Sequence, residues 1–332
     1  MRKLSFIIIA LLLSFNPLKA YSLPQAPSNL LDLAWSLENQ VSFAATETTG
    51  VYIDGHREFN VSRVFVLSPN KFRREYMYPS ELAGDILIDD GIKRYYYQAK
   101  ERVLIIGPTM FNQGQKKLQE KQLQLIFKNY NVTQSPSKFL DRDVTKVTIS
   151  YKEDKKPLLA LWIDNETYIV LKRELYSSDG KVRQYSFYVD IEFNPNFNES
   201  LFVWQKPVGL LKTIEQREES TISLQEAQKR YPDASSIPSI LNNRYECLGV
   251  RESQNGLIFQ FSDGIKKFLV FSVMSLPPLP PIATEKIVNG QRVFYWEINN
   301  IEGIAWNYKN RKFLVIGQLE QNIIERLIED IK

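Results

Sequence analysis

The sequence has 332 residues and contains one cysteine and one histidine. Its 42 basic and 38 acidic residues give a formal net charge of +4, but Arg2, Lys3 and Lys19 all lie close to the N-terminus. Without these three, basic and acidic residues nearly balance, which excludes the basic excess of a nucleic-acid-binding surface. A single cysteine excludes an internal disulfide, so an apolar core must hold the fold.

The N-terminus has the pattern of a secretory signal peptide. Two basic residues precede an apolar run from Leu4 to Leu13, and Ala20 supplies a small residue for cleavage. The run is much shorter than the roughly 20 apolar residues of a membrane-spanning helix. We therefore expect residues 1–20 to be a signal peptide that is removed after Ala20, and the mature protein to be periplasmic.

A long series of strands is predicted after a short helix that begins behind Ser28. Apolar and polar residues alternate with the period of two that is typical of half-buried strands. Turn signals such as Asp54-Gly55 separate the strands. The strands are predicted at residues 41–53, 59–67, 71–78, 86–88, 94–98 and 102–106.

An amphipathic helix is predicted at residues 113–130, where Leu118, Leu123 and Ile126 share one face. Its apolar face could close over a sheet or pack like that of any other helix. Four further strands are predicted at residues 145–151, 158–164, 170–176 and 182–193. Together these elements predict one large meandering antiparallel sheet in a first domain, residues 21–210.

The periodic pattern weakens after Lys206, and we place a domain junction between about residues 210 and 220. A short helix near 224–231 and a hairpin at 256–273 are predicted next, with the hairpin turning at Ser262-Asp263-Gly264. A proline-rich loop, strands between 292 and 317 and a final helix follow. The second domain, residues 220–332, is thus predicted to be small and α+β.

The residues that carry most enzyme chemistry are scarce. His56 is the single histidine, which excludes a Ser/His/Asp triad or a histidine zinc site that needs spaced partners. The carboxylate pairs Asp89-Asp90 and Asp141 with Asp143 fall in turns, where Asp bonds to the backbone. We predict no enzyme activity, no catalytic residue, no metal and no cofactor. Cys247 is expected to be a buried small hydrophobe, with a reactive thiol or an intermolecular disulfide as the alternatives.

Aromatic and aliphatic side chains are abundant on the predicted strands. They can form a filled core, or they can line an apolar cavity between sheet and helix that accepts an acyl chain. Alternation within each strand selects the candidates for such a cavity. The residues predicted to bind lipid are Phe72, Tyr76, Tyr78, Ile86, Ile88, Tyr95, Tyr97, Leu161 and Ile163.

Several short motifs resemble the MucB/RseB family of periplasmic regulators of the envelope-stress sigma factor. In the first domain these are Phe72-Arg73-Arg74-Glu75, Leu161-Trp162-Ile163-Asp164 and Leu171-Lys172-Arg173-Glu174-Leu175. In the tail they are Phe261-Ser262-Asp263-Gly264-Ile265 and the run from Trp306 to Gly317. The resemblance covers nearly the whole mature chain.

The resemblance implies both a fold and a function. The fold class would be α+β, with a large antiparallel half-barrel sheet under a helix lid, as in the carriers LolA and LolB, plus a small α+β C-terminal domain. The function would be to bind the periplasmic segment of a membrane-bound anti-sigma factor and to respond to lipid. The alternative is a LolA-type carrier of lipid or lipoprotein acyl chains. The sequence indicates no oligomeric state.

Overall fold

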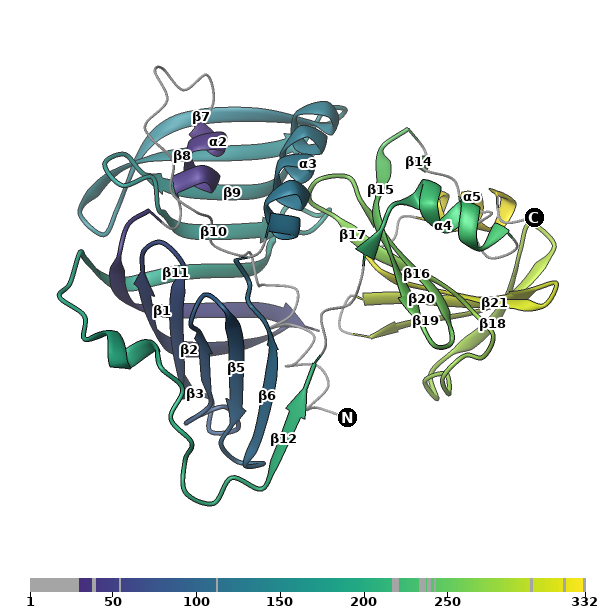
Figure 1. Cartoon of the computed structure of the whole chain (residues 1–332). Coiled ribbons are helices and arrows are strands. Elements are labelled where there is room, and N and C mark those ends of the chain that lie inside the picture. Colours follow the sequence, from purple (N-terminus) through teal and green to yellow (C-terminus); the bar gives the residue numbers. More distant parts are fainter. Residues whose placement is uncertain are drawn as a thin grey trace. The chain divides into compact units, whose positions relative to one another are not determined.

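The computed structural model describes residues 30–37, 40–53, 55–111, 113–216, 221–232, 237, 240–241, 243–298, 301–318 and 321–330. The predicted signal peptide and Ser28 lie outside these residues. The described chain forms two compact units (Figure 1). Unit 1 contains the described residues up to Lys117 and those from Tyr130 to Gln216; unit 2 contains Leu118–Asn129 and those from Thr221 onward. No helix in this part of the chain is both long and apolar enough to cross a membrane.

Unit 1 is built on a single sheet of twelve strands in the order β12-β6-β5-β4-β3-β2-β1-β11-β10-β9-β8-β7. Its neighbouring strands are antiparallel, except that β12 runs parallel to β6. The elements of this part of the chain are α2 (Leu30–Leu37), β1 (Phe43–Ile53), β2 (His56–Leu67), β3 (Lys71–Tyr78), β4 (Ile86–Asp89), β5 (Lys93–Gln98), β6 (Val103–Pro108), α3 (Gln113–Asn129), β7 (Tyr130–Phe139), β8 (Arg142–Tyr151), β9 (Pro157–Asp164), β10 (Val170–Tyr176), β11 (Val182–Phe193), the 3-10 turn η1 (Glu199–Phe202) and β12 (Lys212–Glu215).

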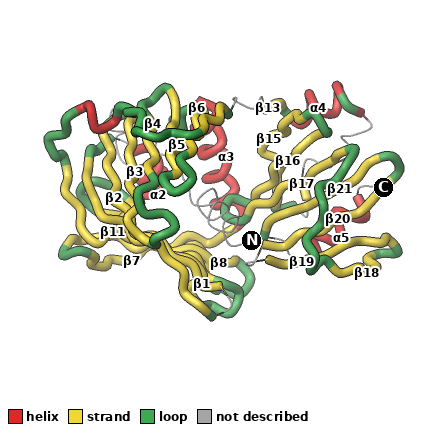
Figure 2. The backbone as a smooth tube through the Cα atoms, turned by 90° about the horizontal axis from the view of Figure 1, so that it is seen from below, coloured by secondary structure: helices red, strands yellow, loops and turns green. Residues whose placement is uncertain are grey.

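The sheet has its first strand at the centre, because β1 pairs with both β2 and β11. The chain moves outward from β1 to β6, crosses through α3 to the opposite edge at β7, and returns through β8 to β11. Helix α3 therefore links the two ends of the sheet along the chain. Figure 2 shows the strands of unit 1 strongly curved, and the predicted half-barrel fold class is confirmed.

Two strands of the sheet were not predicted, β7 and β12, and both are edge strands. Strand β7 (Tyr130–Phe139) lies at the edge, and most of its middle residues are exposed. An exposed edge strand needs no alternating apolar residues, so the periodic signal is missing there. The predicted strands in residues 41–106 and 145–193 are present, with ends that differ by a few residues.

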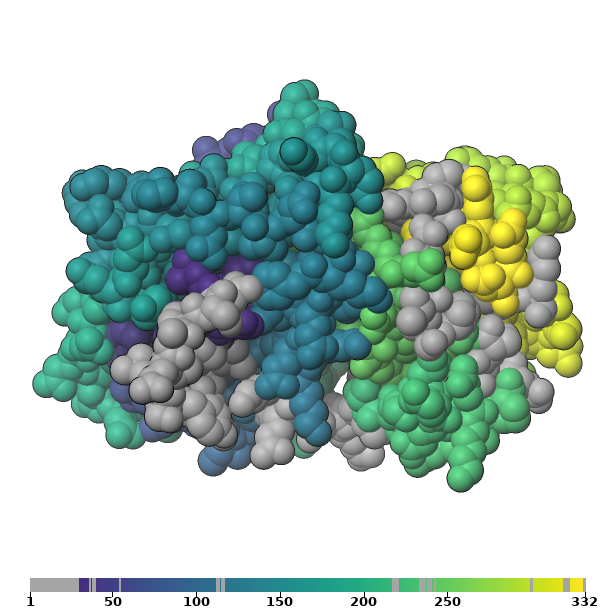
Figure 3. All heavy atoms as spheres, turned by 90° about the horizontal axis from the view of Figure 1, so that it is seen from above, coloured from purple at the N-terminus to yellow at the C-terminus, as the bar shows by residue number. Residues whose placement is uncertain are grey.

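Helix α2 covers part of the sheet. Its apolar residues Leu31, Leu33, Ala34 and Leu37 are all buried. Figure 1 shows α2 in front of β8 and β9, and Figure 3 shows it in purple against teal residues of the later strands. Strand β9 is buried throughout after its first residue. Such a strand has both faces covered, which explains its continuous apolar sequence.

Unit 2 contains a second sheet in the order β13-β15-β16-β17-β21-β20-β19-β18, with β14 paired to β15. The predicted hairpin around Ser262-Asp263-Gly264 is present as β16 and β17, and the final helix packs into the same apolar core. The elements are β13 (Thr221–Ile222), α4 (Leu224–Arg230), β14 (Ile240–Leu241), β15 (Tyr245–Ser253), β16 (Gly256–Ser262), β17 (Lys267–Val273), β18 (Thr284–Val288), β19 (Gln291–Ile298), β20 (Ile301–Tyr308), β21 (Arg311–Gly317) and α5 (Gln321–Asp330).

The C-terminal part of α3 is held by unit 2. The amide nitrogen Nδ2 of Asn129 donates to the carbonyl oxygens of Arg244 at 3.0 Å and Asp263 at 2.9 Å. Gly264 has φ +107°, and a Cβ atom there would come within 2.6 Å of the backbone nitrogen of Ile126. Only glycine accepts both this φ and this close approach. The sequence placed the helix with the first domain, whereas the structure groups Leu118–Asn129 with unit 2.

Candidate functional site

The predicted lipid-binding residues lie on two opposite faces of the sheet in unit 1. Phe72 pairs with Asp89, whereas the next residue, Arg73, pairs with Ile88. Residues that are paired across neighbouring strands share a face, and successive residues of a strand do not. Phe72 and Ile88 therefore point to opposite sides.

The pairing can be followed across the whole sheet. Phe72, Tyr76, Leu161 and Ile163 lie on one side, which we call the Phe72 face. Ile86, Ile88, Tyr95 and Tyr97 lie on the other side, the Ile88 face. A bulge in β3 turns Tyr78 to the Ile88 face, where it stacks on Phe59 at 4.8 Å between ring centroids. The nine residues thus do not line the one pocket expected from the sequence, and lipid binding by either set stays a prediction.

A segment of the chain itself covers part of the Ile88 face. We call residues 194–211, between β11 and β12, the strap. The ring of Trp204 lies 6.1 Å from that of Tyr95 at an interplanar angle of 5°, and 5.7 Å from that of Tyr97. Arg73 Nη1 donates to the carbonyl of Leu201 at 2.9 Å. The strap therefore fills the space beside Tyr95 and Tyr97 that the sequence assigned to an acyl chain.

The Phe72 face combines buried apolar residues with a buried polar patch. Arg74 on β3 forms an ion pair with Glu47 on β1, across the intervening strand β2. Ser62 on β2 is fully buried and pairs in register with Glu47 on one side and Tyr76 on the other. The buried atoms Ser62 Oγ and Arg74 Nε have no hydrogen-bond partner among the described residues.

Electrostatics keep Arg74 charged inside this patch. Burial lowers the pKa of the guanidinium, but Glu47 and Tyr76 outweigh burial, so the net pKa of Arg74 is raised. The guanidinium is partly buried and its buried Nε has no acceptor among the described residues, so an added acceptor there is favourable, because unpaired buried donors are costly. The Phe72 face can therefore offer a polar contact to the head of a ligand whose remainder is apolar.

The acidic turn residues have a structural role. Asp89 is fully buried and accepts hydrogen bonds from the backbone nitrogens of Gly91 and Met110 and from Thr109 Oγ1. Asp90 accepts from the backbone nitrogens of the following turn. Burial raises the pKa of Asp89 despite these bonds. These carboxyls fix the β4–β5 turn and the chain behind it, as Asp does in turns.

The remaining candidates for chemistry are isolated. His56 is exposed at the start of β2. Cys247 is half-buried in β15, and burial raises the pKa of its thiol to about 11. A thiol of this kind is a poor nucleophile, because the thiolate is the reactive form. In the described part of the chain, no group of three His, Cys, Asp or Glu side chains is placed to hold a metal ion.

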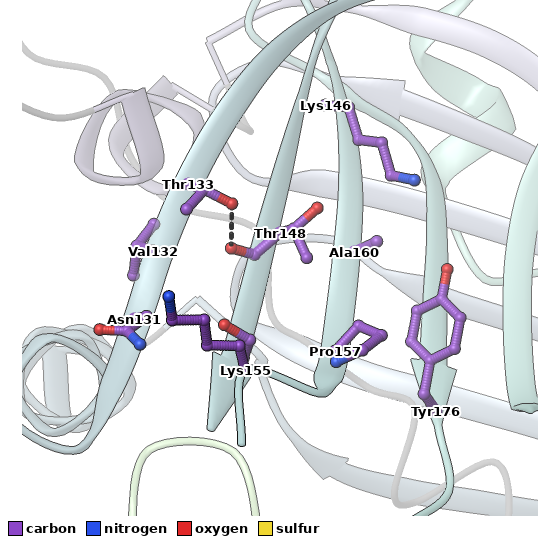
Figure 4. Close-up of a pocket in the computed structure, with 10 residues that line it drawn as sticks. Asn131, Val132, Thr133, Lys146, Thr148, Lys155, Pro157, Ala160 and Tyr176 are labelled. Atoms are coloured by element: carbon purple, nitrogen blue, oxygen red, sulfur yellow. Dashed lines mark hydrogen bonds between the residues drawn. The ribbon is translucent and has the colours of Figure 1, made fainter. Parts of the chain in front are cut away.

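A groove of about 600 Å³ lies over strands β7, β8, β9 and β10 (Figure 4). By register, Lys146 belongs to the Ile88 face, as do Trp162 and Lys172 in the next two strands. The groove is lined by Asn131, Val132, Thr133, Lys146, Thr148, Ser150, Lys155, Pro157, Ala160 and Tyr176. The sequence pointed to none of these residues: three come from the unpredicted strand β7, and those on predicted strands were not among the residues selected for a cavity.

Charged and aromatic side chains organise the edge of this groove. The Nζ atoms of Lys146 and Lys172 lie 4.7 Å and 4.4 Å from the centroid of the Trp162 ring, within cation–π range. Lys172 also pairs with Glu174 at 2.8 Å, and the Tyr176 hydroxyl donates to Glu174. Burial raises the pKa of Glu174, but Lys172 and Tyr176 outweigh it, so its net pKa lies below the usual value.

The architecture defines a class of two-unit proteins, with an open antiparallel half-barrel sheet followed by a smaller α+β unit. Two solved structures share it: the MucA/MucB complex of Pseudomonas aeruginosa and a complex of MucB with MucA(peri). The first match has a TM-score of 0.57 at 12% identity and covers 90% of this chain and 95% of that one. The second has a TM-score of 0.56 at 12% identity and covers 91% and 97%.

The chain therefore has the MucB fold, and the predicted resemblance is confirmed for the fold. No protein-family model matches the sequence, and no curated protein matches it.

Proposed function

We propose that this chain is a regulatory binding protein that holds the periplasmic segment of a membrane-bound anti-sigma factor. One observation carries the proposal: the likeness to MucB solved with MucA spans both units rather than the half-barrel alone. A carrier of the LolA type would need only unit 1. The second unit, and the hydrogen bonds that attach α3 to it, favour a regulator over a carrier.

The proposed place of action is the periplasm. The basic residues, short apolar run and Ala20 at the N-terminus support export and cleavage, with Tyr21 as the first residue of the mature protein. The intact mass of the protein purified from its host tests this. A mass that includes Met1 would contradict the proposal.

We further propose that lipid regulates the protein through the Phe72 face. Phe72, Tyr76, Leu161 and Ile163 supply buried apolar surface there, and Arg74 supplies a partly buried charge. These apolar side chains are packed in this structure, so an amphiphile with its polar head near Arg74 would have to displace them to place its chain along this face. Mass spectrometry of organic extracts of the purified protein tests whether an acyl ligand is carried.

The central experiment is affinity purification of membrane partners. The tagged mature protein is mixed with detergent-solubilised envelope of its own organism, and retained proteins are identified. The expected partner has one membrane span and a sigma-factor-binding cytoplasmic part. Retention of lipoproteins alone, released by added acyl chains, would contradict the regulator and favour the carrier.

A further inference from the structure

Strand β7 is an edge strand whose two halves differ. It pairs with β8 from Tyr130 to Phe139 and ends the sheet. Edge strands present unpaired N–H and C=O groups to which another chain can add. Pro136 and Lys138 protect the second half of β7, because proline lacks a donor and lysine opposes an added apolar strand. Residues 131–135 have neither form of protection.

The groove lies beside this unprotected half. Asn131, Val132 and Thr133 of β7 form one of its walls. Lys146 rises from β8 within it, half-buried and in contact with the Trp162 ring. Lys172, on the other side of that ring, is neutralised by Glu174. The side chain of Lys146 forms no direct ion pair with a described residue, although its charge also acts on Glu174 and helps to lower the pKa of that carboxyl.

A second cation stands at the edge of the sheet. Figure 4 shows Lys155, from the turn after β8, extending toward Asn131 and Val132. The ten lining residues contain two lysines and no Asp or Glu. Hydroxyl groups of Thr133 and Thr148 lie between the lysines. The groove is therefore complementary to a chain that carries two or more carboxylates.

The shape and donor set favour a peptide. A strand added to β7 would direct alternate side chains to the groove side of the sheet, where carboxylates can accept from Lys155, and from Lys146 once its side chain turns from the Trp162 ring toward β7. Arginine forks and nests of backbone N–H groups give a phosphate site its geometry, whereas lysine acts there as a point charge. The lining residues include no arginine and no glycine.

We propose that an extended acidic peptide adds to residues 131–135 of β7 and places its carboxylates on Lys146 and Lys155. The inference rests on the proposed function, since the peptide is taken to be a segment of the bound partner. The docking surface lies within unit 1, and the segment that occupies it must carry alternating acidic residues.

Binding of a defined peptide to the full mature chain tests this inference. The probe is a fluorescein-labelled, C-terminally amidated peptide of alternating threonine and glutamate, with its threonine/glutamine counterpart as the control, followed by fluorescence anisotropy. We expect the glutamine version to bind at least about tenfold more weakly, a difference of about 1.4 kcal/mol. Lys146→Gln should weaken binding of the glutamate peptide by about tenfold. Lys181→Gln, at an exposed lysine in the β10–β11 turn, should leave its affinity unchanged.

Hydrogen exchange of the same complex tests the geometry. Peptide binding should slow amide exchange in residues 131–135, as new interstrand bonds would. The inference would be overturned if the two peptides bound with equal affinity, or if Lys146→Gln left the affinity for the glutamate peptide unchanged. It would also be overturned if the amides of residues 131–135 gained no protection from exchange. Displacement of the peptide by millimolar inorganic phosphate but not by acetate would overturn it too, because that would mark a phosphate site. If the anti-sigma segment is captured but the acidic peptide does not bind, the groove is not the docking surface, and the proposed function is still supported.

Discussion

Arg74 and Glu47 form an ion pair across strand β2 on the buried Phe72 face of unit 1. The two side chains are partly buried, 24% and 13% exposed, so removing one member should cost about 1 to 3 kcal/mol, less than in a fully buried pair. We expect Glu47→Ala to lower the free energy of unfolding by about that amount. The double variant Glu47→Leu with Arg74→Met should recover most of the loss, since an apolar pair of similar volume can replace a buried ion pair. Urea unfolding of all variants measures both; additive losses would contradict the pairing.

The strap depends on the stacking of Trp204 against Tyr95 and Tyr97. Trp204→Ala should destabilise unit 1 by about 1 to 3 kcal/mol and expose residues 194–211 to proteases. Val208→Ala is the matched control, because Val208 lies in the same strap and is fully exposed. Limited proteolysis with mapping of the cuts is the measurement. Equal cleavage of the two variants would mean that the stack does not hold the strap.

Leu161 distinguishes a filled core from a lipid cavity. Its side chain is 3% exposed on the Phe72 face. A packed leucine at such a site is expected to cost about 2 to 5 kcal/mol when changed to alanine. We expect Leu161→Ala to show this loss by urea unfolding. A loss below about 1 kcal/mol, together with altered binding of a fluorescent fatty acid, would instead place Leu161 on the wall of a cavity.

Gly264 attaches the hairpin of unit 2 to α3. Gly264→Ala combines an unfavourable φ of +107° with a contact of 2.6 Å to the Ile126 backbone nitrogen. Gly290→Ala is the control, because Gly290 has φ +77° in the same unit and nothing within 4 Å of its Cβ position. The control should cost about 1 to 2 kcal/mol from φ alone. Gly264→Ala should cost more and should speed hydrogen exchange in α3. Equal losses of stability in Gly264→Ala and Gly290→Ala would show that the close approach to α3 does not add to the cost.

Glu246 should make the attachment of α3 sensitive to acid. Its carboxylate pairs with Lys121 at 2.7 Å and Lys128 at 2.8 Å, and these two lysines hold the pKa of Glu246 below its usual value. A lowered carboxyl pKa stabilises the folded state above the unfolded pKa of about 4.3, and this contribution is lost as pH falls through the folded value. Glu246→Gln should therefore lower stability at pH 7 and have little effect near pH 2. Unfolding measured at both pH values tests the sign, and an equal loss at both would contradict it.

Local sequence determined most of the elements of this protein. Alternation in residues 41–106 and 145–193, and turn signals such as Ser262-Asp263-Gly264, are read from neighbours in the chain. These patterns depend on side-chain period and backbone conformation, so they predict strands and hairpins without any knowledge of distant contacts. The short motifs likewise predicted the MucB-like fold, which the comparison of structures confirmed.

Tertiary structure alone decided how those elements combine. Alternation places Phe72 with Tyr76, and Tyr95 with Tyr97, but only the pairing between strands shows that the two sets face opposite ways. Strand β7 and the strap had no periodic signal, since an exposed edge and a crossing segment are held by long-range contacts. Helix α3 is joined to unit 2 by Asn129 and Gly264, which are far apart in sequence. Such contacts depend on the folded arrangement of the whole unit, and a single sequence carries no local record of them.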